Sequence, residues 1–231
     1  MGLVLQNNAG DKMMDTEIVF LGSERVLIEN EYYNEWKKAQ TQGWLNQFIL
    51  RETLVKKFSW GIPNREALAA IAALGKPIVE MGAGSGYWAM LLQKMGVTVI
   101  PVDREPPPNV FAHNTYTQII KGSCECLSGY PGYALMLCWP PYSTPLAADA
   151  VKAYQGNTII YIGEGYGGCT GDDEFHVLLN NGWELTQEIR IPQWYGIHDF
   201  MGIYQRKHGQ TSQPPGGRAP GLVTAPTRRF P

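Results

Sequence analysis

The sequence predicts an α/β fold in which helices cover both faces of one seven-stranded, mostly parallel sheet, a doubly wound arrangement. Short apolar runs alternate with helical segments between residues 78 and 162, a pattern typical of parallel sheets. A glycine-rich loop stands where the first of these strands gives way to a helix. The last two predicted strands, 183–191 and 200–206, are joined by a link too short for a crossover helix, so they must pair antiparallel.

Length and composition favour one domain with appendages. A chain of 231 residues with 44% apolar and 17% charged residues can bury one sizeable core. The net charge of -2 gives no support to general affinity for nucleic acid. We find no secretory signal and no apolar run approaching the ~18 residues of a membrane span, so we expect a cytoplasmic protein with no membrane partner. Four cysteines are too few for a disulfide framework in a chain of this size.

Three helices are expected before the first strand of the sheet. The spacing of apolar and aromatic residues predicts a helical segment around 26–36 and a second helix over 44–57. Asn64 is placed to cap a third helix, which ends at Gly75. We therefore divide the chain into a helical extension (1–57), an α/β domain (58–206) and a Pro-, Gly- and Ser-rich tail (207–231) expected to be disordered.

The elements of the α/β domain follow from changes of period along the chain. The predicted strands are 78–80, 97–102, 117–120, 134–138, 158–162, 183–191 and 200–206, with helices at 87–95 and 145–154.

The strongest chemical signal is the run Glu80-Met81-Gly82-Ala83-Gly84-Ser85-Gly86 between a strand and a helix. Alternating glycines let the backbone approach a ligand closely, and the helix start offers free N–H groups. Gly84-x-Gly86-x-x-Ala89, with Asp103 about 20 residues on, also fits a relaxed dinucleotide pattern, so the loop alone leaves a nicotinamide cofactor open. A tight turn without a ligand is a third possibility.

The acid before the first glycine and the antiparallel last pair favour another cofactor. Here the chain resembles the class I S-adenosylmethionine-dependent methyltransferases, whose first motif reads acid-x-G-x-G-x-G; the resemblance covers roughly residues 58–206. It implies a Rossmann-like domain that binds S-adenosylmethionine as methyl donor. Asp103 matches the acid that accepts hydrogen bonds from the ribose hydroxyls, a task that suits a carboxylate. The implied cofactor-binding residues are Glu80, Gly82, Gly84, Gly86, Asp103, Trp139 and, near the adenine, Ser123 or Cys124.

A second motif, Trp139-Pro140-Pro141-Tyr142, ends the strand over 134–138. It resembles the Asp/Asn/Ser-Pro-Pro-Tyr/Phe signature of methyltransferases that act on exocyclic or amide nitrogens. The resemblance implies that the Pro140 carbonyl accepts a hydrogen bond from the target amino group and that Tyr142 stacks on a flat substrate. Trp139 departs from the signature because an indole has no acceptor. A turn that merely ends the strand is the alternative.

Further candidates surround this motif. Glu164, at the end of the strand over 158–162, could accept a proton or bind a cationic amine, whereas Asp172 suits the N-cap of the next helix. His198 beside Asp199 could be a general base, but neighbouring residues on a strand point to opposite faces. Cys124-x-Cys126 lacks a second pair of ligands, so no metal is expected.

The sequence is compatible with three functions. The first is transfer of a methyl group from S-adenosylmethionine to a heteroatom, most simply nitrogen, of a flat small molecule or nucleobase. The catalytic residues would then be Pro140, Tyr142 and Glu164. The alternatives are a binding protein in which Trp139 fills the acceptor site, and an NAD-dependent oxidoreductase. A nucleic-acid acceptor has weaker support because basic residues are not concentrated in the α/β domain.

Overall fold

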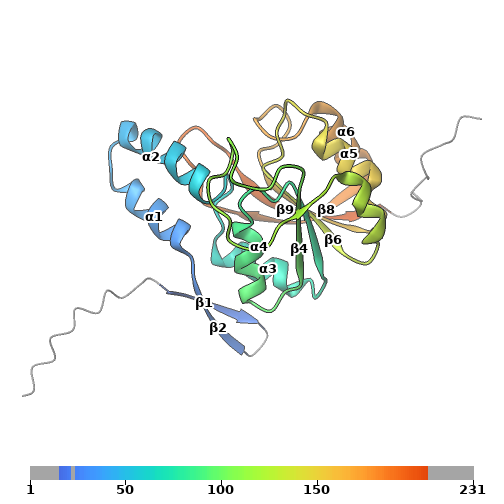
Figure 1. Cartoon of the computed structure of the whole chain (residues 1–231), viewed down its shortest axis with the longest axis horizontal. Helices are drawn as coiled ribbons and strands as arrows, with labels where there is room; N and C mark the ends of the chain where they lie inside the picture. Colours follow the sequence, from blue (N-terminus) through green and yellow to red (C-terminus); the bar gives the residue numbers. More distant parts are fainter. Residues whose placement is uncertain (1–15, 22–23, 208–231) are drawn as a thin grey trace, which may run out of the picture.

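The computed structural model describes residues 16–21 and 24–207, and nearly all of the predicted tail lies outside these residues (Figure 1). In chain order the elements are β1 (Thr16–Leu21), β2 (Glu24–Glu29), α1 (Glu31–Gln40), α2 (Trp44–Lys57), α3 (Arg65–Ala73), β3 (Ile78–Met81), α4 (Tyr87–Lys94), β4 (Val99–Asp103), β5 (Ile120–Lys121), the 3-10 helix η1 (Cys124–Gly129), β6 (Ala134–Cys138), α5 (Leu146–Ala153), β7 (Thr158–Gly163), α6 (Asp173–Gly182), β8 (Trp183–Arg190) and β9 (Phe200–Arg206). Within the described residues, no helix has the length and apolar character needed to cross a membrane.

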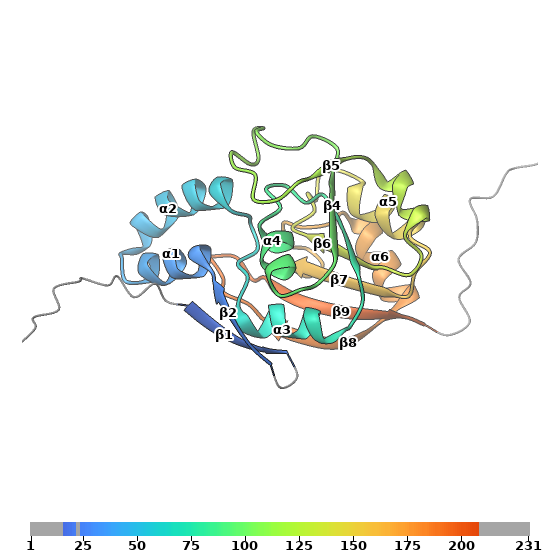
Figure 2. The same ribbon diagram turned by 60° about the horizontal axis from the view of Figure 1, so that its bottom comes forward.

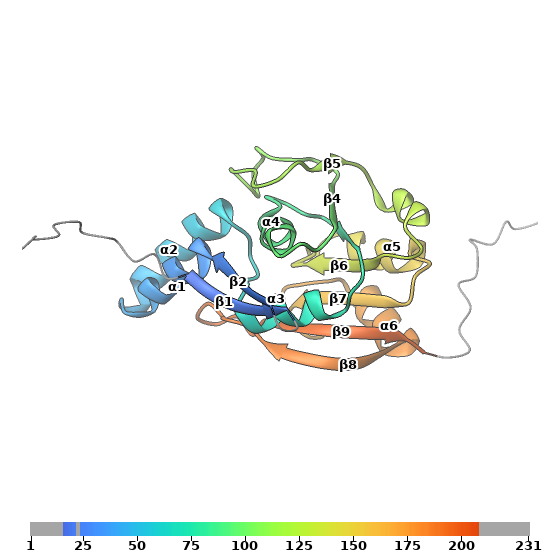
Figure 3. The same cartoon turned by 90° about the horizontal axis from the view of Figure 1, so that it is seen from below.

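The seven strands β3 to β9 form one sheet in the order β5-β4-β3-β6-β7-β9-β8. The five strands from β5 to β7 are parallel, and β9 runs antiparallel to both of its neighbours. Figure 3 shows β6, β7, β9 and β8 lying side by side in that order. The predicted doubly wound, mostly parallel sheet with an antiparallel final pair is confirmed.

Successive side chains of the strands point to opposite faces of the sheet and pack into two separate hydrophobic cores, one on each face. Ile78 packs with α3 and α4, whereas the next residue, Val79, packs with α5 and α6 on the other face. The two helix layers are visible on either side of the strands in Figure 2. The carboxyl ends of β3, β4, β6 and β7 therefore meet at one edge, between the two layers of helices.

The start of the chain differs from the prediction. Residues 26–29, placed in a helical segment by their spacing, belong to strand β2, which pairs antiparallel with β1. A run of six residues is too short for periodicity to separate a strand from a helix. The first helix begins only after Asn30, whose side chain accepts a hydrogen bond from the Tyr33 amide and so caps α1. The predicted strand 117–120 is also wrong for most of its length, since pairing is limited to Ile120 and Lys121.

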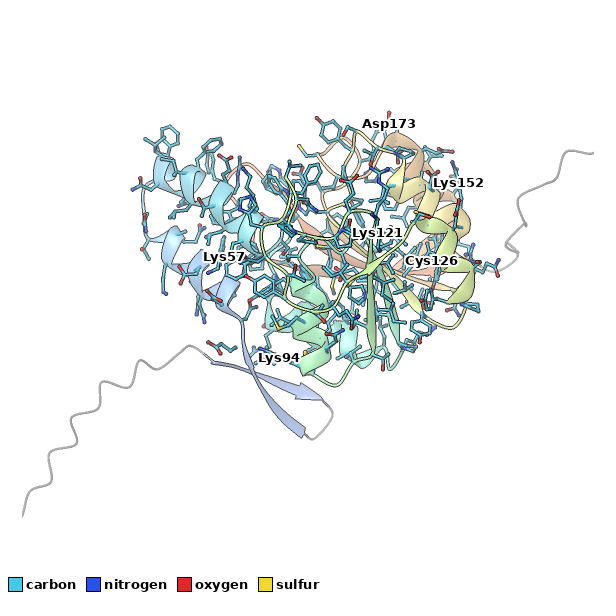
Figure 4. The ribbon with its side chains drawn as sticks, in the orientation of Figure 1. Lys57, Lys94, Lys121, Cys126, Lys152 and Asp173 are labelled. Carbon is cyan, nitrogen blue, oxygen red and sulfur yellow. The ribbon has the colours of Figure 1, made fainter. Side chains whose placement is uncertain are left out.

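The N-terminal helices share their core with the sheet. Tyr32 of α1 is fully buried, stacks on Phe58 with ring centroids 4.9 Å apart, and accepts a hydrogen bond from the Trp194 indole at 3.1 Å. Where α1 and α2 come together, Lys57 forms an ion pair with Glu31 at 2.6 Å; Figure 4 labels Lys57 there. A boundary at residue 57 remains a prediction, but no separate core marks it among the described residues.

Asn30 provides a test of how firmly α1 is fixed to the α/β domain. Its buried side chain caps α1, donates to the Pro63 carbonyl at 2.8 Å and accepts from the Tyr87 hydroxyl at 3.2 Å. Asn30→Ala should lower the free energy of unfolding by about 2–4 kcal/mol, since it removes a cap and leaves buried polar groups unpaired. Asn64→Ala, which removes the cap of α3, should cost only about 1 kcal/mol. Urea denaturation measures both losses. Equal losses of unfolding free energy in Asn30→Ala and Asn64→Ala would contradict the proposed role of Asn30 in fixing α1.

Candidate functional site

The glycine loop joins β3 to α4 in a left-handed backbone conformation. Gly82, Gly84 and Gly86 have φ angles of 75°, 54° and 72°, which side chains disfavour. A methyl group built on Gly84 would meet nothing within 4 Å, so the loop presents an open face at this position. Gly86 stands at the N-terminus of α4.

Asp103 closes the loop against the end of β4. Its Oδ2 accepts a hydrogen bond from the Gly84 amide at 2.9 Å, and its Oδ1 accepts one from the Glu105 amide at 2.8 Å. Each carboxylate oxygen retains a second lone pair, so the group still has acceptor capacity for a hydroxyl. The ribose-binding role of Asp103 stays a prediction, and the structure places its carboxylate beside the glycine loop.

Glu80 is a buried carboxyl group directly before the loop. Its Oε2 has no hydrogen-bond partner within the described residues. Burial, with a smaller contribution from nearby Asp103, raises the pKa of Glu80 to about 8. A carboxylate buried without a partner is costly, and a cation beside it would offset that cost and favour the ionised form.

The residues predicted near an adenine follow β5 at the sheet's edge. The Gly122 amide donates to the Asp103 carbonyl at 2.9 Å, which holds the exposed Ser123 close to the end of β4. Cys124 is half-buried, its sulfur lies 3.7 Å from the Leu146 carbonyl oxygen, and burial raises the pKa of its thiol to about 11. No group of three or more His, Cys, Asp or Glu residues suited to a metal ion is found in the part of the chain that the structure describes.

Trp139 begins the turn after β6 with a φ of 52°, a conformation that residues other than glycine rarely adopt. Its ring lies nearly parallel to that of Trp60, at 13° and with centroids 4.3 Å apart. Its indole N–H donates to Asp199 Oδ2 at 2.7 Å. Backbone strain of this kind persists only where the surroundings fix it, and here a stacked ring and a buried carboxyl group do so.

Asp199 is a stronger candidate for a site residue than its sequence context indicated. It is buried, its Oδ1 has no partner among the described residues, and burial raises its pKa to about 7 despite the opposing hydrogen bond from Trp139. The neighbouring His198 side chain is exposed and faces Glu164, with Nδ1 3.5 Å from Oε1. His198 and Asp199 belong to the loop before β9 and not to a strand. Among the described residues no hydrogen bond joins their side chains, so the predicted use of His198 beside Asp199 as a general base gains no support.

The rest of the motif lies between the turn and the loop after β7. The Pro140 carbonyl already accepts a hydrogen bond from the Gly171 amide at 2.8 Å. Tyr142 is exposed and lines an open cavity of about 370 Å³, which we call the α6 cavity. The cavity is otherwise lined by the loop at 167–171 and the start of α6. Pro140 and Tyr142 remain predicted acceptor-site residues, of which Tyr142 has the freer side chain.

Glu164 connects two loops. Its Oε2 accepts from the Cys169 amide and its Oε1 from the His198 amide, both at 2.8 Å. Burial alone would raise the pKa of Glu164, but these backbone hydrogen bonds outweigh it and lower the pKa. A carboxylate with a lowered pKa and two backbone donors is a weak proton acceptor, so the predicted catalytic role gains no support. Asp172 caps α6 as predicted, accepting from the Phe175 amide at 3.1 Å.

Solved structures with similar folds were found, although no protein-family model and no curated protein matches the chain. Magnesium protoporphyrin IX methyltransferase from Synechocystis PCC 6803, with bound S-adenosylmethionine, is 11% identical, with a TM-score of 0.47 over 77% of this chain and 95% of that one. The 1,6-didemethyltoxoflavin N1-methyltransferase of Burkholderia thailandensis, with S-adenosylhomocysteine, is 16% identical, with a TM-score of 0.46 over 83% and 96%. Both are methyltransferases. Likeness this low carries no inference about activity, which must come from this chain's own residues.

The Trp139–Asp199 pair predicts a pH-dependent stability. The pKa of Asp199 is raised above its ordinary 3.8, so the folded state holds the proton more tightly and the free energy of unfolding falls as pH rises from about 4 to about 7. Trp139→Phe keeps a ring on Trp60 but removes the N–H donor. It should cost about 1–3 kcal/mol at pH 8, where Asp199 is ionised, and much less at pH 5.

Urea denaturation at both pH values measures this difference, and the Asp199→Asn background is the control. There the same Trp139→Phe change should cost equal amounts at pH 5 and pH 8. A loss that does not depend on pH in the otherwise wild-type chain would show that Asp199 does not titrate near neutrality.

Proposed function

We propose that the chain is an S-adenosylmethionine-dependent methyltransferase that acts on a heteroatom, most simply nitrogen, of a flat acceptor. The observation that carries this proposal is the glycine loop held between two carboxyl groups. Asp103 binds the loop at Gly84, and Glu80, whose Oε2 has no partner among the described residues, is buried immediately before it. Both stand at the carboxyl ends of neighbouring parallel strands, where folds of this class hold ligands.

The hydrogen bonds of the loop favour the methyl donor over a dinucleotide. A pyrophosphate binds through free N–H groups at the start of the helix. Here the amides of 82 and 83 donate to the Val102 carbonyl, that of Gly84 to Asp103, and that of Tyr87 to the Ser85 hydroxyl. The Asp103 carboxylate beside the loop would also repel a doubly negative pyrophosphate. The donor has no phosphate and carries positive charge on its sulfonium and its ammonium group, which suits an acidic site.

The transfer itself needs position more than a dedicated base. The bond between the methyl carbon and sulfur breaks as the bond to the acceptor nitrogen forms, the sulfonium becomes a neutral thioether, and the nitrogen's proton leaves to water. In-line approach and exclusion of water supply most of the acceleration for such a step. The weakness of Glu164 as a proton acceptor is compatible with this chemistry.

The acceptor side is assigned to the turn after β6. Tyr142 would supply a stacking face and Pro140 a carbonyl, while Trp139 forms the wall nearest the donor. Trp139 points to Trp60 and Asp199, and it does not line the α6 cavity. This arrangement favours an enzyme over a binding protein whose acceptor site is filled by Trp139.

Donor binding and methyl transfer can be tested separately. Calorimetry of the full chain should detect S-adenosylmethionine and S-adenosylhomocysteine but not NAD. Incubation with donor labelled in its methyl group, against panels of aromatic metabolites, nucleosides, nucleic acids and peptides, should label a small flat molecule. Binding of NAD without binding of the methyl donor would overturn the proposal in favour of an oxidoreductase.

Gly84→Ala is a sharp test of the donor site. A methyl group at Gly84 has room in the free protein but would occupy the open face of the loop, so donor affinity should fall at least about tenfold. Gly75→Ala is the matched control, because Gly75 has a similar φ of 60° and equally open space at the end of α3. Both variants should lose about 1–2 kcal/mol of stability from left-handed strain. Equal donor affinity in the two variants would contradict the assignment.

Donor binding should also release a proton from Glu80. At pH 7 a group with a pKa of about 8 is mostly protonated, and a bound cation should lower that pKa and drive the proton off. Calorimetry at pH 7 is run in phosphate and in Tris, because their different ionisation enthalpies reveal the number of protons released on binding. The wild type should release about one more proton than Glu80→Gln. The variant should bind the donor about ten- to a hundredfold more weakly. Identical proton release by the wild type and Glu80→Gln would show that the positive charge of the donor does not lie beside Glu80.

A further inference from the structure

A second open cavity, of about 300 Å³, lies between α2 and the segment that connects β4 to β5. We call it the α2 cavity. Phe48, Arg51 and Trp60 line one side, and Val110 and Phe111 line the other. The two sides are fastened together by the His113 amide, which donates to the Lys56 carbonyl at 2.9 Å. The volume is at the lower end of the range found for sites that bind small molecules.

Much of the wall of the α2 cavity is apolar, and three of its large apolar side chains are open to solvent. Phe48 is 58% exposed, Phe111 69% and Val110 76%. Large apolar side chains left this exposed on facing elements are typical of a surface that a ligand covers. Aromatic faces on the two sides suit a flat apolar ring inserted between them.

One positive charge in the α2 cavity is not neutralised. Glu52 and Lys56, which also line the cavity, pair with each other at 2.9 Å. Arg51 has no ion pair among the described residues; its guanidinium lies 4.6 Å from the centre of the Phe48 ring and 6.0 Å from that of Trp60. A guanidinium held against rings, without an ion pair among the described residues, is suited to bind a carboxylate of a ligand.

The α2 cavity adjoins both halves of the proposed active site. Trp60, part of its wall, stacks on Trp139 at the start of the turn after β6. Val110 and Phe111 belong to the segment that leaves Asp103, and Figure 2 shows this segment running from β4 toward α2. The α6 cavity is less suited to a flat anion, because Asp172, Asp173 and Glu174 line it.

We infer that the ring of the methyl acceptor binds in the α2 cavity, so that Trp60 and Phe111 supply its stacking faces in place of Tyr142, and that Arg51 selects acceptors which carry a carboxylate. The acceptor class is thus a flat aromatic acid with a nitrogen to methylate. This assignment rests on the proposed function, but the binding it requires can be measured without any donor.

The binding experiment uses 2-naphthoate and its uncharged counterpart 2-naphthalenemethanol, titrated into the full chain by calorimetry. Wild type should prefer the acid at least about tenfold, and Arg51→Gln should remove that preference while leaving the affinity for the alcohol unchanged. Arg65→Gln, on α3 and paired with Glu66, is the control and should behave as wild type. Phe111→Ala should weaken both ligands equally. A preference that survives in Arg51→Gln would overturn the role of Arg51.

The transfer experiment uses 3-amino-2-naphthoate and its methyl ester with labelled donor. The acid should be the better acceptor for wild type, and Arg51→Gln should reduce the ratio of the two rates at least about tenfold. Arg51-dependent binding of 2-naphthoate together with preferred labelling of uncharged acceptors would overturn the acceptor assignment. Arg51-dependent binding in a chain that binds no methyl donor would leave the cavity as an aromatic-acid site and defeat the proposed function alone.

A second copy of the chain is the competing occupant of this face, because Trp44, Leu45 and Ile49 of α2 are also exposed. Sedimentation of wild type and Phe48→Glu distinguishes the two. A dimer that dissociates in Phe48→Glu, with no binding of 2-naphthoate to either protein, would assign the face to self-association and overturn the proposal.

Discussion

The geometry of parallel strands is the constraint on which the rest of this molecule depends. Because β3, β4, β6 and β7 run in one direction, their carboxyl ends meet at a single edge, and every loop that leaves them starts from that edge. Four acidic residues gather there: Glu80 before the glycine loop, Asp103 at the end of β4, Glu164 directly after β7, and Asp199 beside the turn after β6. Two of them, Glu80 and Asp199, are buried with an oxygen that has no partner among the described residues. Burying these carboxyl groups with unpaired oxygens costs free energy, and a cationic ligand bound at this edge of the sheet would offset that cost.

Those parts of the fold that follow from long, regular patterns could be predicted from the sequence. The alternation of apolar runs with helices predicted the sheet and its antiparallel end, and the two Asx caps at Asn64 and Asp172 were identified from residue type and position alone. The hairpin of β1 and β2 could not be identified, because a six-residue apolar run fits either period. The pairing of β5 was overestimated for a related reason: most of the chain between Asp103 and Ile120 is irregular, and propensity says little about such a segment.

The candidate site shows the same division. The glycine loop and Asp103 are linked in the structure by a hydrogen bond that residue spacing could suggest but not prove. Asp199 was harder to find, since its importance comes from burial and from a bond to Trp139, 60 residues away in sequence. The role of Glu164 stays a prediction, and its surroundings could not be foreseen for the opposite reason. A lone acid at a strand end looks available, and only the fold reveals that backbone amides from two loops already occupy it. Trp139, which breaks the expected motif, gains a physical explanation once Trp60 and Asp199 are seen beside it.

The packing of Tyr32 has a consequence for how separable this protein's parts are. Its ring fills space among Phe58, Tyr87 and Trp194, which come from three well-separated stretches of the chain. A chain trimmed to the sheet and its flanking helices would lose the ring that packs among these three side chains, and it would lose the α2 wall of the α2 cavity. The N-terminal helices are therefore an integral part of the domain and not a separate module. They could not be transferred to another protein without Phe58, Tyr87 and Trp194, the residues that pack against Tyr32.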